Sequence, residues 1–285
     1  MKKSFVERVA RLFLSYMCSF VLFAFLSFIC IRITLFRPAF MCQQIENSHY
    51  VTNVHEEINE KIQDLGRGIN IPPDKVKNIV GVPFVEKNMA HYVKALYADN
   101  SFTLQGENEL RQTIYKSVKQ YAVEKKIKTD VQMNDRINHF IDSSMNKIRQ
   151  SIEIPYLADF VNKINGGKSI MNLFIIGSGI LFCLLIGMMW DLFRSFREKL
   201  NYITIIFAGT GLSFLILPLW FYLNNIVSRV GVLTKSLYEF IKTYLTAFDL
   251  IFVKTGFSII FLSVGIYVLY SAVEYRRNHT KVNRF

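Results

Sequence analysis

The feature that most constrains this fold is an uncharged apolar stretch over residues 170–190, IMNLFIIGSGILFCLLIGMMW. At about 20 residues it is long enough, as a helix, to cross a hydrocarbon core of roughly 30 Å. Three further apolar runs of comparable length occupy residues 12–31, 202–223 and 255–273. The sequence therefore predicts an all-α protein with a four-span transmembrane helical bundle.

A mainly polar region, residues 38–168, separates the first apolar run from the second. Its apolar residues recur every three to four positions, which is typical of amphipathic helices packed around a core of their own. Helices are expected over about 48–65, 107–123 and 130–150, with others opened by Pro73, Pro83 and Pro155. The last of these comes before Gly166-Gly167 and the second span. We expect an all-helical extracytoplasmic domain inserted between spans 1 and 2.

Basic residues set the expected topology. They lie before the first run, between the second and third runs, and after the fourth, and positive charge in short segments holds those segments in the cytoplasm. The first run is too long for a signal-peptide core and no small-residue cleavage site follows it, so we interpret it as an uncleaved anchor. The protein is thus expected in the cell membrane, multi-pass, with cytoplasmic N- and C-termini.

The expected order of segments follows from these two patterns. It is a cytoplasmic basic arm (1–11), span 1 (12–31), the extracytoplasmic helical domain (38–168), span 2 (170–190), a cytoplasmic loop (191–201), span 3 (202–223), an outer amphipathic connection (224–254), span 4 (255–273) and a cytoplasmic basic tail (274–285). The connection carries Leu237, Phe240, Tyr244 and other apolar residues on one side of a helix. We expect it to lie along the lipid headgroups or to form a platform under the outer domain.

The net charge of +12 does not indicate nucleic-acid binding. Residues 38–168 hold 17 Lys+Arg against 16 Asp+Glu, so the excess lies in the membrane part, at the ends of the spans. Basic residues there orient the protein and contact anionic lipid, and no basic stripe alternates with aromatic residues. The expected partner of this charge is the lipid bilayer, with no nucleic acid. Usage rich in Lys, Asn, Ile and Phe favours a bacterial source.

No motif for catalysis, a cofactor or a metal emerges. His55 opens HEEIN, which has Asn59 where a zinc-protease motif needs its second histidine, so His55 is expected on a solvated helix face. The predicted spans contain no Asp, Glu, Lys, Arg or His, although proton relays and ion-coupled transporters normally need such groups at membrane depth. We therefore expect a protein that is not an enzyme, with no catalytic residue, no cofactor and no metal.

Small residues recur at intervals of four within two spans. Gly179, Cys183 and Gly187 share one face of the second span, and Gly209 and Ser213 share one face of the third. Such ladders allow helices to approach closely. They are interpreted as helix-packing sites within the bundle, with an interface to another subunit as the alternative.

The order of one span, a large outer domain and three more spans resembles the permease subunits of FtsX/MacB-type ABC transporters in topology alone. The chain also resembles uncharacterised four-pass membrane proteins of low-GC Gram-positive bacteria. The leading hypothesis is a non-enzymatic membrane protein whose outer domain binds a protein or cell-envelope partner. The alternative is a permease-like subunit that couples a cytoplasmic ATPase to the outer domain, with Phe193 and Phe196 as possible partner contacts in the cytoplasmic loop.

Overall fold

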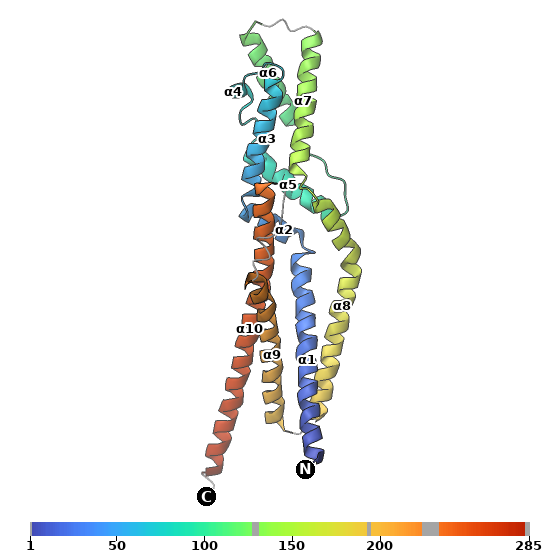
Figure 1. Cartoon of the computed structure of the whole chain (residues 1–285), viewed down its shortest axis with the longest axis vertical. Coiled ribbons are helices and arrows are strands. Elements are labelled where there is room, and N and C mark those ends of the chain that lie inside the picture. The colour runs from blue at the N-terminus through green and yellow to red at the C-terminus, as the bar shows by residue number, and fades with distance from the viewer. Residues whose placement is uncertain (1, 127–130, 193–194, 224–233, 283–285) are drawn as a thin grey trace. The chain divides into compact units, whose positions relative to one another are not determined.

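The computed structural model describes residues 2–126, 131–192, 195–223 and 234–282, and this part of the chain is helical without a strand. The expected all-α fold class is therefore confirmed. The helices are α1 (Lys2–Thr34), α2 (Pro38–Asn47), α3 (Tyr50–Arg67), α4 (Pro73–Val76), α5 (Val82–Tyr97), α6 (Glu107–Glu124), α7 (Val131–Ile152), α8 (Leu157–Leu192), α9 (Phe196–Leu223) and α10 (Lys235–Val282), as Figure 1 labels them.

Two compact units make up the chain. One, here called the bundle unit, comprises residues 1–34, 167–230 and 245–285. The other, here called the helical domain, comprises residues 35–166 and 231–244. Four stretches are helices long and apolar enough to cross a membrane: Val9–Thr34, Leu157–Leu192, Phe196–Phe221 and Lys235–Ala272. Four such helices indicate a multi-pass membrane protein, as the sequence predicted.

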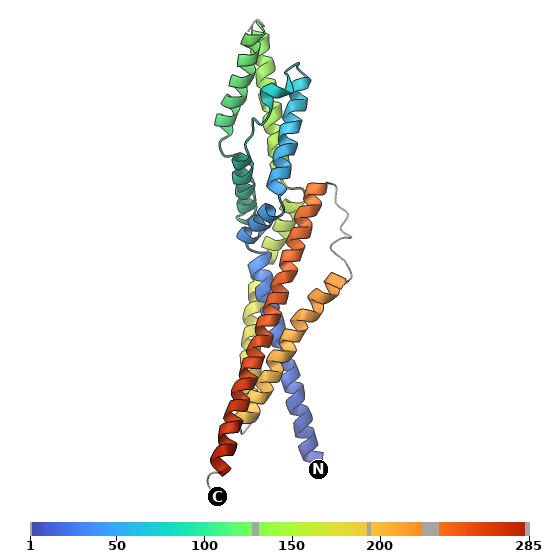
Figure 2. The same ribbon diagram turned by 90° about the vertical axis from the view of Figure 1, so that its left-hand side faces the viewer.

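In the bundle unit, α1 packs along α9; the two helices lie next to each other in Figure 1 and cross in Figure 2. Cys18 and Leu22 of α1 form a buried cluster with Ile206 of α9 and Met189 of α8. Polar contacts join the helices as well: Thr210 Oγ1 donates to the Ser19 carbonyl at 3.0 Å. Hydrogen bonds of this kind between apolar helices contribute about 0.6 kcal/mol on average. The bundle is therefore held mainly by packing, with a few polar contacts that fix the register.

Helices α9 and α10 approach each other closely at Gly211 of α9 and Gly256 of α10. A Cβ added at Gly211 would lie 2.6 Å from Ile260 Cγ1 and 3.1 Å from the Gly256 carbonyl oxygen. A Cβ at Gly256 would likewise lie 3.1 Å from the Gly211 carbonyl oxygen. A larger residue at either position would require neighbouring atoms to shift, and these include main chain that cannot move aside independently.

The helical domain is built from amphipathic helices that bury their apolar stripes together. Figures 1 and 2 show α3 and α7 running side by side, and these two helices supply much of the core. The largest side chains that are almost wholly buried in this domain are Met41, Ile58, Ile62, Met89, Ile114, Ile137, Ile148 and Ile152. Buried apolar residues recur three or four positions apart along these helices, as Val51, Val54, Ile58 and Ile62 do in α3, which explains why the sequence pattern predicted them.

Four of the expected helices lie within a few residues of the observed ones: α3, α5, α6 and α7. Helix α2 precedes the first helix expected in the polar region and was missed. Pro38 is the first residue of α2, a position that suits proline because its missing N–H has no helical partner there. The chain between α1 and α3 is therefore helical as well.

Helix α8 continues through Gly166-Gly167, where the sequence suggested a boundary between the last domain helix and the second span. A glycine within a helix costs about 1 kcal/mol relative to alanine, which a helix of 36 residues can absorb. Residues 157–166 belong to the helical domain and the rest of α8 to the bundle unit. One helix thus supplies both units.

Helix α10 also joins two segments that the sequence analysis separated, the connection at 224–254 and the span at 255–273. Its residues up to Tyr244 belong to the helical domain; Leu233 and the rest of 224–233 lie outside the described residues. The Phe240 ring lies 5.5 Å from the Tyr50 ring, and the Tyr244 ring lies 5.4 Å from the Phe40 ring, measured between centroids. The apolar side of this segment is therefore buried against α2 and α3.

A buried amide fixes the loop that leads into α6. Asn88 of α5 is fully buried; its amide donates to the carbonyls of Phe84 and Gln105, and its Oδ1 accepts the Gln105 N–H at 2.7 Å. The side chain therefore satisfies main-chain groups of the loop that neither helix can satisfy.

Replacing Asn88 with alanine should lower the free energy of unfolding of the helical domain by about 2 kcal/mol, because it leaves the Gln105 N–H and carbonyl without these partners. Amide hydrogen exchange across 84–110 should report the loss. Glu86→Ala, at an exposed position on the same helix, is the matched control and should change exchange little. Equal exchange in both variants would contradict this role of Asn88.

Candidate functional site

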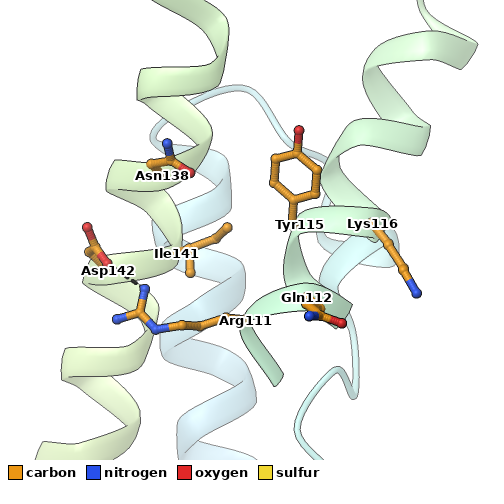
Figure 3. Close-up of a pocket in the computed structure, with 7 residues that line it drawn as sticks. All are labelled: Arg111, Gln112, Tyr115, Lys116, Asn138, Ile141 and Asp142. Carbon is orange, nitrogen blue, oxygen red and sulfur yellow. Dashed lines mark hydrogen bonds and ion pairs between the residues drawn. The ribbon is translucent and has the colours of Figure 1, made fainter. Parts of the chain in front are cut away.

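The candidate site is an open groove between α6 and α7 of the helical domain (Figure 3). Two adjacent rows of α6 line one wall, at positions 111 and 115 and at 112 and 116, because residues four apart share a helix face. One row of α7, at 138, 141 and 142, lines the other wall. The groove has a volume of about 540 Å³ and is lined by Arg111, Gln112, Tyr115, Lys116, Asn138, Ile141 and Asp142.

An ion pair closes one end of the groove. Figure 3 shows Arg111 reaching from α6 to Asp142 on α7, and Arg111 Nη1 lies 2.7 Å from Asp142 Oδ1. Arg111 Nε also donates to Glu107 at 3.0 Å, and Glu107 accepts from Arg149 of α7 at 3.4 Å. The hydrogen bond to Asp142, followed by that to Glu107, raises the pKa of Arg111. These contacts connect α6 to α7 and hold the guanidinium in place.

The remaining lining offers mainly hydrogen-bond donors and amides. Buried Ile141 lies between the two helices, while Tyr115 and Asn138 extend from opposite walls (Figure 3). Gln112 and Lys116 extend from α6 on the side away from Arg111, and Lys119 Nζ lies 5.4 Å from the centroid of the Tyr115 ring. Amide, phenol and ammonium groups around a small apolar floor are suited to binding a polar chain, such as a peptide segment or a saccharide.

Side chains able to act as an acid, a base or a metal ligand are few in the described groove. The one carboxylate in the groove, Asp142, already pairs with a guanidinium, and no histidine or cysteine lines the cavity. Within the described part of the chain, no three His, Cys, Asp or Glu side chains gather closely enough to hold a metal ion.

His55 and Asn59, the residues of the incomplete zinc motif, have a structural part instead. His55 Nε2 lies 2.9 Å from the Val80 carbonyl oxygen, to which Asn59 Nδ2 also donates at 3.1 Å. Both side chains thus hold the segment before α5 against α3. The expectation that His55 lies on a solvated face is wrong: it is half-buried, and Asn59 is buried.

The predicted helix-packing residues are placed differently from one another. A Cβ at Gly179 would lie 3.2 Å from the Phe25 ring of α1, and a Cβ at Gly209 would lie 2.8 Å from Ser19 Oγ. Ser213 donates to the Gly209 carbonyl within α9. Cys183 is exposed in the bundle unit, and no described atom lies within 4 Å of a Cβ built on Gly187. The ladder on α8 therefore contacts α1 at Gly179.

The two possible partner contacts lie at the start of α9. Phe193 is outside the described residues, whereas Phe196 is the first residue of α9 and is 59% exposed. Nearby cations contact aromatic rings: Lys199 Nζ lies 4.2 Å from the Trp190 ring centroid, and Arg197 donates to the Tyr270 hydroxyl at 3.0 Å.

The residues of the groove escaped the sequence analysis because they are ordinary polar surface types on two helices about 30 positions apart. The sequence shows that two pairs of polar residues lie four positions apart on α6. It does not show which helix lies opposite them. Comparison with protein-family models, curated proteins and solved structures finds no match for this chain, so its function has to be argued from these side chains.

Proposed function

We propose that this chain is a non-enzymatic integral membrane protein whose helical domain lies outside the cytoplasm and binds a protein or cell-envelope partner. The observation that carries the proposal is the open α6–α7 groove, whose lining is rich in donors and amides. An interface needs such groups where they can reach a partner, with a fixed framework behind them. The ion pairs of Arg111 and Glu107 supply that framework.

Basic segments support the outside placement. Lys and Arg cluster in residues 2–11 at the start of α1, around the start of α9 and in residues 276–284. If these three segments are cytoplasmic, an odd number of spans separates the first of them from residues 35–166, which places the helical domain on the opposite side. The groove would then face the cell envelope or the medium.

A single reagent can test both parts of the proposal. Cysteine is introduced at Gln112 in a Cys42→Ser background, and intact cells are treated with a membrane-impermeant maleimide that carries a photoreactive group. Native Cys42 is a poor probe, because burial raises the pKa of its thiol. Labelling at position 112 followed by a discrete cross-linked product is expected, whereas a cysteine in place of Ser195 should stay unlabelled.

Variants of the groove distinguish specific binding from chance contact. Tyr115→Ala or Lys116→Glu, each combined with the cysteine at position 112, should lower the cross-linked yield at least roughly tenfold if these side chains contact the partner. Glu56→Lys, at an exposed position of α3, is the control charge change. Labelling at Ser195→Cys from outside would overturn the topology. Capture of a cytoplasmic ATPase through Phe196, with no groove product, would favour the permease-like subunit instead.

A further inference from the structure

A second cavity lies within the bundle unit, between α9 and α10. It has a volume of about 450 Å³, and its walls are apolar except at one end. Leu215 and Leu219 line it from α9, and Leu250, Val253 and Phe257 line it from α10. The exception is Asp249, the only charged side chain among its lining residues.

The polarity of this cleft changes along its length. Positions 246, 249, 250, 253 and 257 are three or four apart and so share one face of α10. Thr246 and Asp249 come first, and the apolar side chains follow over the next two turns. Leu215 lies at the apolar end, because a Cβ on Gly256 would lie 3.0 Å from Leu215 Cδ2. The cleft therefore has one polar end and one apolar end.

Asp249 has no ion-pair partner in the described part of the chain. It is half-buried, although a carboxylate against apolar side chains is costly unless a cation pairs with it. Lys254, five positions on, lies on another side of α10, and Lys242 is two turns away, roughly 10 Å along the axis. The described residues thus leave this carboxylate available to a cation from outside the chain.

We propose that this cleft binds a membrane lipid with a primary ammonium headgroup. The ammonium pairs with the Asp249 carboxylate, and an acyl chain lies along Leu250, Val253 and Phe257. A metal ion fits poorly, because Ca²⁺ and Mg²⁺ need several oxygen ligands and the cleft supplies one carboxylate and one hydroxyl. A small soluble amine would leave the apolar end empty. The ligand that matches both ends is an amphiphile with a cationic head. This proposal does not depend on what the α6–α7 groove binds.

The test uses the full-length chain in phosphatidylglycerol vesicles that contain a trace of a photoreactive lipid. Two probes with the same diazirine-bearing acyl chain are compared, one with an ethanolamine headgroup and one with a glycerol headgroup. The ethanolamine probe should label peptides of α9 and α10 roughly tenfold more strongly than the glycerol probe. Only its ammonium can form a charged hydrogen bond with Asp249, and such bonds are stronger than neutral ones. Equal labelling by the two probes would overturn the proposal.

Variants locate both ends of the site. Asp249→Asn should reduce labelling by the ethanolamine probe to the level of the glycerol probe, whereas Asp249→Glu should keep most of it. Asp191→Asn, an exposed acidic residue of α8, is the control. Val253→Trp should block labelling by filling the cleft with Asp249 intact, while Phe261→Trp, at a 78% exposed position, should not.

The other outcomes of these experiments also decide whether the cleft binds the lipid. Unchanged labelling in Asp249→Asn or in Val253→Trp would exclude the cleft as the site. If the Asp249→Asn protein does not insert into the membrane, the comparison of Asp249→Glu with Val253→Trp still shows whether the cleft is labelled. Soluble ethanolamine at millimolar concentration should not compete with the lipid probe; competition would show that the head alone is recognised and would overturn the lipid assignment.

Discussion

Replacing Phe240 with alanine should destabilise the helical domain by about 3–5 kcal/mol, the range for removing a buried aromatic side chain. Phe240 is 5% exposed and lies between the rings of Tyr50 and Tyr244. The cavity left behind would be bounded by α3 and by α10 itself, and neither helix can close it without moving main chain. The loss should therefore lie near the upper part of that range.

Hydrogen exchange of the full-length chain in detergent can measure this loss locally. Protection should fall in the peptides of α2 and α3, which are distant in sequence from position 240 but in contact with its helix. Lys242→Ala, at an exposed position of α10, should leave exchange unchanged. If both variants behave alike, or if protection falls in α10 alone, residues 235–244 do not belong to the core of the domain.

The second large effect is expected at Gly211. Even Gly211→Ala places a methyl group 2.6 Å from Ile260 Cγ1 and 3.1 Å from the Gly256 carbonyl, so α9 and α10 have to separate. Overpacking of this kind costs about 1–3 kcal/mol, and here the obstacle includes main chain. We expect the melting temperature of the bundle unit in detergent to fall by roughly 5–10 °C.

Gly177→Ala is the matched control, since no described atom lies within 4 Å of a Cβ built there. Both substitutions replace glycine with alanine inside a long apolar helix, so any general gain in helix propensity, at most about 1 kcal/mol, is common to them. The difference between the two melting temperatures then reports the α9–α10 contact. A Gly211→Ala protein as stable as Gly177→Ala would contradict the close crossing.

The two glycines show what the sequence could not reveal about the bundle. Gly209 and Ser213 were singled out because they lie four apart, whereas Gly211 has Phe207 and Leu215 at those distances. The close crossing pairs one glycine from each of two helices, and spacing within one helix does not indicate such a pair. Apolar length alone predicted the spans because the bilayer thickness fixes how many residues a span needs.

Amphipathic periodicity predicted α3, α5, α6 and α7 for a similar reason: each buries one stripe in a core. The same reasoning failed where local residues usually mark an end. Pro38 begins α2, and Gly166-Gly167 lies inside α8, because packing and helix length outweigh the preference of one or two residues. The α6–α7 groove and the Asp249 cleft depend on which helices become neighbours, and no pattern within a single helix specifies that.

The helical domain is discontinuous in sequence, and this has a consequence for its biosynthesis. Residues 35–166 leave the ribosome first, but the segment that carries Leu237, Phe240 and Tyr244 follows roughly 65 residues later. At about 5–20 residues per second, the early part waits roughly 3–13 seconds with the binding surface for these side chains uncovered. During that interval the nascent domain exposes apolar side chains to any chaperone or protease that meets it. A truncation after the third span should therefore be degraded, although it contains every helix from α2 to α7.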